Sequence, residues 1–440
     1  MLSIQTLRER TEDVRRSLAN RQTEAPLDRI LELDLRRREL LRDVEAGRAE
    51  RNAASKRIGG ATDPEERQRL IEAQRAESSR LDGLEASLKE VEAELEPLML
   101  LVPNIPHPDV PVGVEEDAVV VIEGHGGEGW EWRVETPRRV ADEPLPERDE
   151  ASRPHWEIGE ALGIIDFERG AKVGGSHAFM LRDDGARLQR SLIAWMLDLH
   201  RGRGYREVYP QALVRSEMLV GTGQLPKFAE TMFHLAGTDL WLIPTAEVPV
   251  TNMYRDEILA ADDLPRHHVA YSPSFRNEQF SAGRDVRGIK RVYQFDKVEL
   301  VKFVPEDASW EALEALLDDA LEVVRRLGFR YRVIRLATAD TTFASAMTYD
   351  IEVWAPGAGE WLEVSSVSNF EDFQARRANL RYRDESGTVR YVHTLNGSGL
   401  ALPRTLATIL EQYVLEDGSV EVPPVLRPYL GGQTSIEARA

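Results

Sequence analysis

The sequence contains no cysteine, which excludes disulfide bonds, thiolate nucleophiles and cysteine-ligated zinc. It also contains no run of about 18 apolar residues, the length that a membrane-spanning helix needs. The first residues, MLSIQTLRERTEDVRR, lack the apolar core of a signal peptide. We therefore expect a cytoplasmic protein that has no membrane partner.

Positive charge is scarce relative to negative charge. The chain has 56 lysines and arginines against 76 aspartates and glutamates, which gives a net charge of −20. Such a chain is poorly suited to general nucleic-acid binding, but a local basic site remains open because salt screens charges more than about 10 Å apart. With 440 residues, of which 42% are hydrophobic and 30% charged, the composition is typical of a folded protein of two or more domains.

Aromatic residues are absent between positions 27 and 97, where arginine, glutamate, leucine and alanine dominate. In the second half of this stretch apolar residues recur at alternating spacings of three and four, which is a heptad seam: Leu81, Leu84, Leu88, Val91 and Leu95. A looser version of the pattern precedes it: Ile30, Leu33, Leu40 and Val44. Between the two, the GGATDP sequence at 59–64 ends one helix and begins the next.

We expect these two helices to pack antiparallel as an intramolecular hairpin arm, each about 45 Å long at about 1.5 Å per residue. A dimerisation coiled coil is the alternative, and the turn chemistry favours the intramolecular arm. The first helix carries nine basic against seven acidic residues. This is a weak indication of phosphate contact, because mixed charge usually serves to solvate a helix face.

Prolines in VPNIPHPDVPVG, at 102–113, indicate a linker. After about residue 115 short β-rich runs alternate with helical segments such as 186–200 and 310–327. We predict an α+β chain with an N-terminal domain at 1–110, which contains the arm at about 27–97. The domain at 111–440 is predicted to be built on a mostly antiparallel sheet flanked by helices.

Basic residues gather in SFRNEQFSAGRDVRG, at 274–288, which contains Arg276, Arg284 and Arg287. The stretch lies between two strand-like segments and is predicted to be a hairpin loop, either solvated or part of a pocket for a polyanion. Alternation along the returning strand places Glu299 on a face with aromatic and apolar neighbours. A carboxylate there is either an edge residue in water or a buried group that needs a donor, and a ligand hydroxyl or ammonium would suit.

A second hairpin is predicted at 349–368, with its turn at 356–359. Alternation on the returning strand places four residues on one face: Trp361, Glu363, Ser365 and Val367. With Ser366 close behind, Glu363 offers the hard oxygen ligands that Mg²⁺ prefers. Two oxygens alone are a weak metal signature.

Near the end of the chain, NGSG at 396–399 predicts a glycine-rich turn, and an amphipathic helix follows it. Arg404 falls in the first turn of that helix, where the helix dipole also favours an anion. A helix cap with a solvated arginine is the alternative. Each of these signals is weak alone, but an arm, two separate arginines, a glycine-rich segment and strand carboxylates form a specific combination.

This combination resembles the seryl-tRNA synthetase family of class II aminoacyl-tRNA synthetases over nearly the whole chain. GYREVYPQALV at 204–214, with its proline at Pro210, resembles class II motif 1. FRNE at 275–278, followed by SAGRDVRGIKRVYQFDKVE, resembles motif 2, and NGSGLALPRTLATILE at 396–411 resembles motif 3. Three further stretches are similar to sequences characteristic of the seryl enzymes: GTGQLPKF, IPTAEVPVTN and EVSSVSNFEDFQARR.

The resemblance implies ATP-dependent attachment of L-serine to tRNA(Ser) through a seryl-adenylate, with Mg²⁺ as cofactor. It also implies serylation of tRNA(Sec) where that tRNA is present. The helical arm is then expected to grip the long variable arm and elbow of the tRNA. Motif 1 is the dimer element of the family, so a homodimer is expected.

The site residues follow from the matching motifs. The catalytic residues implied are Arg276, Glu278 and Arg404. The ATP site implied comprises Arg276, Asn277, Glu278, Val292, Glu363, Val364, Ser365, Ser366 and Arg404. The serine site implied comprises Thr245, Ala246, Glu247, Arg276, Glu299, Asn396 and Ser398. Glu363 and Ser366 are the implied Mg²⁺ ligands.

The chain departs from the family pattern at two places. Members commonly read Phe-Arg-Ser-Glu-Ala-Gly where residues 275–280 read FRNEQF, so that Gln279 and the bulky Phe280 stand where small residues are common. Met347 stands where a lysine is frequent. Both changes affect the expected rate, affinity or loop movement rather than the reaction type. Arg284 and Arg287 are expected either to brace the loop or to contact the tRNA acceptor end.

Three other interpretations compete. A seryl-type paralogue that loads an amino acid onto a carrier protein lacks the long arm. A catalytically silent tRNA-binding relative is expected to lose the arginines, whereas Arg276 and Arg404 are both present. A simple coiled-coil interaction protein leaves residues 115–440 unexplained.

Overall fold

The structure is a computed structural model that describes residues 1–147, 152–278 and 287–438. The chain divides into two compact units. The first comprises Met1–Ala19 and Thr23–Pro103, and the second comprises Asn20–Gln22 and Asn104–Ala440. None of the helices within the described ranges is long and apolar enough to cross a membrane.

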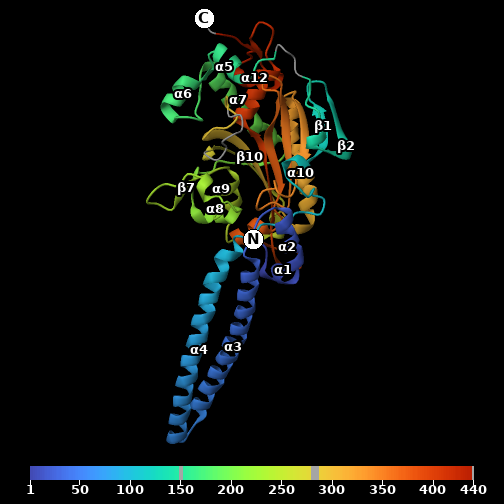
Figure 1. Cartoon of the computed structure of the whole chain (residues 1–440). Coiled ribbons are helices and arrows are strands. Elements are labelled where there is room, and N and C mark those ends of the chain that lie inside the picture. Colours follow the sequence, from blue (N-terminus) through green and yellow to red (C-terminus); the bar gives the residue numbers. More distant parts are fainter. Residues whose placement is uncertain (148–151, 279–286, 439–440) are drawn as a thin grey trace. The chain divides into compact units, whose positions relative to one another are not determined.

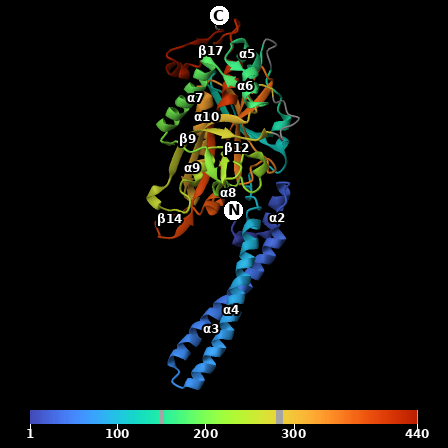
Figure 2. The same cartoon turned by 90° about the vertical axis from the view of Figure 1, so that its left-hand side faces the viewer.

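The first unit is helical. Its helices are α1 (Ile4–Glu9), α2 (Thr11–Asn20, whose last residue belongs to the second unit), α3 (Leu27–Gly60) and α4 (Pro64–Met99). Figures 1 and 2 show α3 and α4 lying side by side as a hairpin. Asp63 caps α4 by accepting a hydrogen bond from the Glu65 N–H at 3.2 Å, and Pro64 occupies the first turn, where its missing N–H costs nothing. The predicted helical hairpin is confirmed.

The two long helices are held by a narrow apolar seam and by ion pairs beside it. Leu40, Val44 and Leu81 are fully buried, and Gly47 lets the helices approach, because a Cβ there would lie 3.1 Å from the Leu81 Cδ1. Arginines of α3 pair with glutamates of α4 along the hairpin: Arg29 with Glu94 at 2.7 Å, Arg37 with Glu92 at 2.9 Å and Arg48 with Glu85 at 2.8 Å. Three of the basic residues on which phosphate contact was predicted are therefore paired with glutamates inside the arm.

The second unit is built on a mostly antiparallel sheet, as predicted. Among the described residues nine strands form this sheet, in the order β2-β1-β11-β12-β13-β16-β10-β9-β5, and β5 pairs with β9 in parallel. The strands are β1 (Val119–His125), β2 (Trp130–Arg139), β5 (Arg206–Val208), β9 (Arg266–Phe275), β10 (Gln294–Val304), β11 (Arg330–Arg335), β12 (Met347–Ala355), β13 (Glu360–Asn369) and β16 (His393–Ala401).

Helices and short strands surround this sheet. The helices are α5 (His155–Ala161), α6 (Phe167–Gly174), α7 (Asp183–Gly202), α8 (Ser216–Thr222), α9 (Glu247–Asn252), α10 (Ser309–Arg326), α11 (Phe373–Ala378) and α12 (Leu402–Gln412). The short strands are β3 (Ile165–Asp166), β4 (Met180–Leu181), β6 (Leu213–Arg215), β7 (Leu240–Leu242), β8 (Ile258–Ala260), β14 (Arg381–Arg383), β15 (Val389–Tyr391), β17 (Val420–Glu421) and β18 (Ser435–Ile436).

Alternate residues of β10 belong to two different cores. Val298 and Leu300 pack in the main core with α7, α10 and α12, whereas Val301 and Phe303 pack in a smaller core with α9 and α11. Glu299 shares the second face, as alternation predicted. The predicted hairpin between β9 and β10 is also confirmed, because Phe275 pairs with Gln294.

The second predicted hairpin is formed by β12 and β13, with its turn at 356–359. The predicted face is wrong. Ile351 pairs with Ser365 and Glu352 pairs with Glu363, so Val364 is an extra residue in a β-bulge. The bulge brings Ser366 to the face of Glu363, while Ser365 and Val367 are buried away from it.

The glycine-rich turn predicted at 396–399 is also wrong, because these residues lie inside β16. The glycines serve close packing rather than a turn. A Cβ on Gly397 would lie 3.2 Å from Val367, and one on Gly399 would lie 2.8 Å from the His200 Nε2. Gly399 is also the extra residue of a second bulge, since Val298 pairs with Leu400 and Glu299 with Ser398.

Candidate active site

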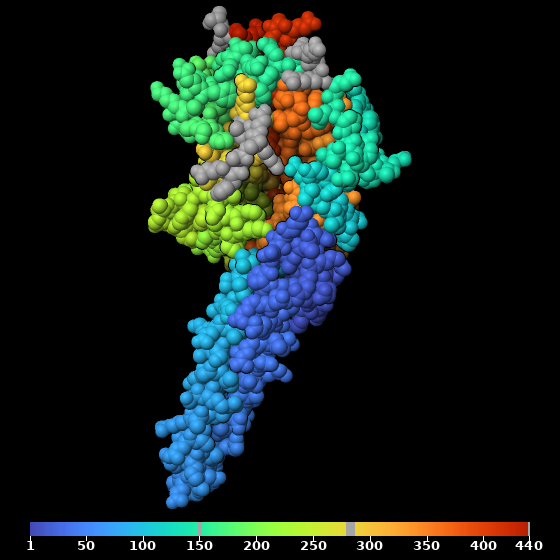
Figure 3. Space-filling model, viewed as in Figure 1, coloured from blue at the N-terminus to red at the C-terminus, as the bar shows by residue number. Residues whose placement is uncertain are grey.

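A cavity of about 160 Å³ lies among the central strands of the second unit. The space-filling view shows the surface hollowed between the yellow-green residues around α8 and α9 and the orange residues of the central strands (Figure 3). Most of the predicted site residues line this cavity: Thr245, Arg276, Glu278, Val292, Glu299, Glu363, Val364, Ser366, Asn396, Ser398 and Arg404. Residues separated by more than 150 positions in the sequence therefore meet in one small space.

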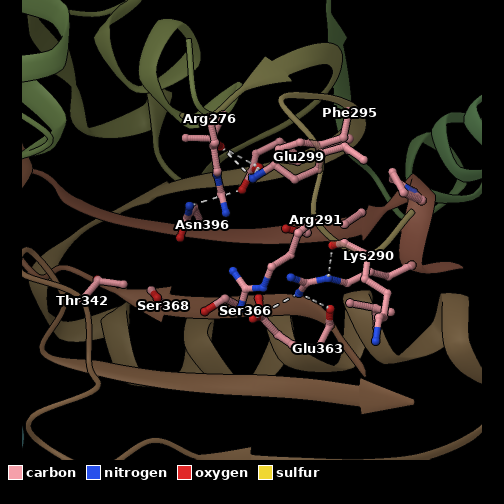
Figure 4. A pocket seen from close by; sticks show the side chains of 18 of the residues that line it. Arg276, Lys290, Arg291, Phe295, Glu299, Thr342, Glu363, Ser366, Ser368 and Asn396 are labelled. Atoms are coloured by element: carbon pink, nitrogen blue, oxygen red, sulfur yellow. Dashed lines mark hydrogen bonds and ion pairs between the residues drawn. The ribbon is translucent and has the colours of Figure 1, made fainter. Parts of the chain in front are cut away.

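One wall of the cavity is organised around the Glu299 carboxylate, which is 1% exposed. It accepts hydrogen bonds from the Thr245 Oγ1 at 2.9 Å and the Asn396 Nδ2 at 3.2 Å, and it pairs with the Lys297 ammonium. Lys297 also donates to the Thr245 Oγ1 at 2.8 Å. Figure 4 shows Glu299, Asn396 and Arg276 gathered on one side of the cavity. Since a carboxylate offers about four acceptor positions, Glu299 retains capacity for a ligand donor.

Glu247 lies behind this wall and does not line the cavity. Its carboxylate is 7% exposed and accepts a hydrogen bond from the Gln374 Nε2 at 2.6 Å. Burial, and then the charge of Glu299, raises the pKa of Glu247 from its ordinary 4.5 to about 7. Ala246, beside it, is buried in the smaller apolar core.

The opposite wall carries positive charge next to Glu363. Arg404, in the first turn of α12, donates through Nη1 to the Glu363 carbonyl at 2.7 Å and lies 3.3 Å from the Glu363 carboxylate. Its Nε donates to the Lys290 carbonyl at 3.3 Å. The Glu363 side chain is 46% exposed, yet partial desolvation by the surrounding walls alone would raise its pKa. The charges of Arg404 and Arg276 outweigh this effect and lower that pKa. Figure 4 shows Glu363, Ser366, Lys290 and Arg291 on this side.

Oxygen donors suited to Mg²⁺ lie on this second wall. The Glu363 carboxylate and the Ser366 hydroxyl both face the cavity, and the buried Asp350 stands opposite Ser366 in the β12–β13 pairing. Burial and the charge of Glu363 raise the pKa of Asp350 well above its ordinary value. Within residues 1–147, 152–278 and 287–438 no cluster of three or more His, Cys, Asp or Glu side chains is placed to hold a metal. The donor set fits Mg²⁺ held by few protein ligands together with substrate phosphates.

Two predicted ATP-site residues lie outside the first cavity. Asn277 lines a neighbouring cavity of about 460 Å³ and donates through its backbone to the Thr231 carbonyl at 2.9 Å. Ser365 is buried behind the wall, where its hydroxyl donates to the Ser398 carbonyl at 2.8 Å. The two cavities share four residues: Thr245, Arg276, Glu278 and Arg291.

The departures from the family pattern have different positions. Gln279, Phe280 and Arg284 lie outside the described residues. Met347 is 4% exposed and packs in the main core of the second unit. Arg287 lies over the Trp156 ring, with its guanidinium carbon 5.2 Å from the ring centroid.

The sequence prediction did not include several residues that line the cavity, among them Thr342, Ser368 and Phe370. Thr342 belongs to the loop between β11 and β12, for which no pairing pattern exists. Ser368 lies two residues beyond Ser366 on the same face, a position that alternation gives once the bulge at Val364 is known. Lys297 also has no role in the sequence prediction, although its spacing of two residues from Glu299 places both side chains on one face of β10 and would have indicated the pair.

Comparison with known proteins gives the family. The chain matches the family model of the seryl-tRNA synthetase N-terminal domain at residues 1–106 and that of the tRNA synthetase class II core domain (G, H, P, S and T) at residues 233–413. It is 55% identical over 438 residues to a serine–tRNA ligase of Thermomicrobium roseum, covering 99% of this chain and 95% of that protein. A serine–tRNA ligase of Chloroflexus aurantiacus is 52% identical over 438 residues, covering 99% of this chain and 100% of that protein.

Solved structures agree with this similarity. The crystal structure of seryl-tRNA synthetase from Pyrococcus horikoshii complexed with ATP matches with a TM-score of 0.89 and 35% identity, covering 100% of both chains. The cytoplasmic serine–tRNA ligase of Naegleria fowleri in complex with AMP matches with a TM-score of 0.85 and 27% identity, covering 100% of this chain and 99% of that one. The chain therefore belongs to the seryl-tRNA synthetase family of class II aminoacyl-tRNA synthetases.

Proposed function

We propose that this chain joins L-serine to tRNA(Ser) with consumption of ATP, in two steps at the cavity of the second unit. The observation that carries the proposal is the union, in one cavity of about 160 Å³, of a cationic wall and a wall of hydrogen-bonding groups. The cationic wall suits phosphates, and the Glu299 wall suits an ammonium and a hydroxyl. Full-length similarity to serine–tRNA ligases supports the same reaction.

In the first step a serine carboxylate oxygen attacks the α-phosphorus of ATP, the bond to the bridging oxygen of the β-phosphate breaks, and pyrophosphate leaves. The attacking carboxylate is already ionised near neutral pH, so this step needs no general base. Negative charge accumulates on the phosphoryl oxygens. We assign its stabilisation to Arg276 at the α-phosphate and Arg404 near the γ-phosphate, because fixed cations in a confined site lower the energy of such a transition state. Glu278 helps to position the adenine.

Mg²⁺ is part of the proposal. Glu363 and Ser366 would hold the ion, which supplies charge neutralisation to the phosphates when bound. The remaining work of this wall falls to the chain itself: Arg404 holds the Glu363 carbonyl and carboxylate in place from the start of α12.

Serine selectivity is assigned to Thr245, Glu299 and Asn396, with Ser398 beside them. An amino acid that lacks the hydroxyl leaves a buried acceptor without a donor, so alanine and glycine are rejected. Threonine adds a methyl group, which the small cavity excludes by its bulk.

In the second step the 3′-terminal adenosine hydroxyl of the tRNA attacks the carbonyl carbon of seryl-adenylate, and AMP leaves. We assign tRNA contact to the N-terminal domain at 1–110, in which exposed basic residues of α3 such as Arg42, Lys56 and Arg57 are available to phosphates. Because such contact recognises shape rather than sequence, tRNA(Sec) is included where the host has one. The proposal includes a homodimer formed through motif 1 and a cytoplasmic location.

Serine-dependent exchange between ATP and pyrophosphate tests the first step, with alanine, glycine and threonine as controls. Exchange with serine alone is the expected result. Exchange with alanine or glycine instead would indicate the paralogue that loads a carrier protein. Absence of exchange in folded protein supplied with Mg²⁺ would indicate a catalytically silent relative and would refute the proposal.

A further inference from the structure

A buried histidine–glutamate pair lies outside the cavity and has no part in the reaction described above. The side chains of His155, the first residue of α5, and Glu411, in the last turn of α12, are both fully buried. The His155 Nδ1 lies 2.7 Å from the Glu411 Oε1. A buried carboxylate is costly unless donors surround it, so the pair needs a structural reason.

Glu411 connects three segments that are distant in the sequence. Its Oε1 accepts a hydrogen bond from the His155 backbone N–H at 2.9 Å as well as from the ring. Its Oε2 accepts one from the Ala358 N–H at 3.0 Å, in the turn between β12 and β13. The carboxylate thus joins α12 to the start of α5 and to the hairpin that carries Glu363.

His155 extends this connection to the returning side of the β9–β10 loop. The Ile289 N–H donates to the His155 Nε2 at 3.2 Å, so Nε2 is the acceptor and the ring proton lies on Nδ1, where it is donated to Glu411. Gly288 permits this approach. It has a φ of +80°, and a Cβ at this position would lie 2.1 Å from the His155 Nε2.

Lys290, which follows Ile289, lines the cavity. The Lys290 carbonyl accepts the hydrogen bond of the Arg404 Nε at 3.3 Å, and the Lys290 ammonium donates to Glu360 at 2.5 Å. Trp156, which follows His155, lies under the cations of Arg287 and Lys290, at 5.2 and 5.9 Å from its ring centroid. The start of α5 therefore contacts this segment through both of its first two side chains.

We propose that His155 is a positioning residue for the ATP site: held by Glu411, it fixes the backbone at Ile289 so that the Lys290 carbonyl orients Arg404. This inference rests on the proposed function only in naming ATP as the molecule that Arg404 binds. A purely structural role is the alternative, in which loss of His155 lowers stability and affects both substrates equally.

Two substitutions separate the links of His155. The amide of Asn reaches about as far as Nδ1, so His155→Asn keeps a donor for Glu411 and removes the acceptor of the Ile289 N–H. The amide oxygen of Gln reaches about as far as Nε2, so His155→Gln keeps that acceptor. His268→Asn is the matched control, because His268 is also buried, accepts or donates one hydrogen bond with the Tyr254 hydroxyl at 2.9 Å and does not line the cavity.

The assay is serine-dependent ATP–pyrophosphate exchange with each substrate varied, together with hydrogen exchange of the peptide that contains Ile289. We expect His155→Asn to raise the KM for ATP about tenfold, the usual effect of one lost buried hydrogen bond, with the KM for serine changed less than about twofold. Its Ile289 peptide should exchange faster than in the parent chain. His155→Gln keeps the acceptor for the Ile289 N–H but loses the ring donor to Glu411, so both of its values should lie closer to the parent chain than those of His155→Asn.

Two results would overturn the inference. One is an unchanged KM for ATP in His155→Asn. The other is a loss of exchange activity in both His155→Asn and His155→Gln that affects ATP and serine equally and follows the fall in melting temperature, as in His268→Asn. A parent chain without exchange activity would refute the proposed function instead, while the hydrogen-exchange comparison would still decide whether His155 anchors Ile289.

Discussion

Glu247 gives the most direct test of the electrostatics of the cavity wall around Glu299. Its carboxyl is 7% exposed, lies beside Glu299 and receives a neutral amide hydrogen bond from Gln374. Burial and the neighbouring negative charge raise its pKa from 4.5 to about 7. In the free protein near neutral pH, therefore, about half of the molecules hold a proton on Glu247.

The sign of the effect on stability follows from proton binding. Between about pH 4.5 and 7 the folded state keeps a proton that the unfolded state has released, so the free energy of unfolding falls as the pH rises through this window. Above about pH 7 both states are ionised and no further loss occurs. At about 1.4 kcal/mol for each pH unit, the whole loss is about 3 kcal/mol, of which about 2 kcal/mol falls between pH 5.5 and 8.5.

Glu247→Gln removes the titrating group and keeps the shape of the side chain. Between about pH 5.5 and 8.5 we expect the free energy of unfolding of the parent chain to fall by about 2 kcal/mol more than that of this variant. Urea unfolding followed by tryptophan fluorescence measures the difference. All eight tryptophans lie in the second unit, so the signal is free of the separate unfolding of the arm.

A matched control is Glu385→Gln, because Glu385 is exposed in the turn between β14 and β15. Its unfolding free energy should follow that of the parent chain at both pH values. Parallel pH dependence of the parent chain and Glu247→Gln, within about 0.5 kcal/mol, would refute the reasoning. It would mean that Glu247 ionises as an ordinary carboxyl despite its burial.

Three further predictions address the two substrates and the arm. Glu299→Gln should reduce serine-dependent pyrophosphate exchange about 100-fold, through the KM for serine and kcat, because the serine ammonium and hydroxyl lose a charged acceptor. ATP binding measured by calorimetry should be nearly unchanged, and equal losses of serine exchange and ATP binding would contradict the assignment. Replacing residues 27–97 by a short flexible linker should preserve serine activation and abolish tRNA charging, whereas charging at the parent rate would show that the arm does not bind tRNA. Leu81→Ala, which opens a space beside Gly47, should cost the arm about 2–5 kcal/mol in thermal unfolding followed by circular dichroism, with serine activation unaffected; an unchanged arm transition would contradict the packing argument.

The helical arm was predictable because its information is local. Heptad spacing identifies the buried stripe, and GGATDP combines a helix end with an N-cap and a proline in the first turn of α4. The β9–β10 hairpin was predictable for a similar reason, since alternation fixes the face of each strand residue. In both cases the residues that form the pattern are near neighbours in the sequence.

The two errors in the sheet have different physical causes, a β-bulge in β13 and close packing against the glycines of β16. An extra residue at Val364 reverses the face of all residues on one side of it, and so Ser366 rather than Ser365 joins Glu363 at the cavity. The NGSG sequence has the composition of a turn, yet its glycines are needed where Val367 and His200 approach the backbone. Neither reason can be inferred without the neighbouring strand or helix.

The roles of the basic residues at 274–288 also depend on residues that the sequence pattern does not reveal. Arg276 directly follows β9 and lines the cavity, whereas Arg287 lies over Trp156 at the start of α5. Two arginines of one sequence cluster thus have different roles, which depend on the residues that the fold places beside each of them. The same rule explains why Glu299 is suited to recognise a small ligand: Thr245, Lys297 and Asn396 come from different segments and already hold its oxygens. A carboxylate fixed before the ligand arrives loses little conformational freedom on binding, so its interactions contribute to selectivity rather than to ordering the site.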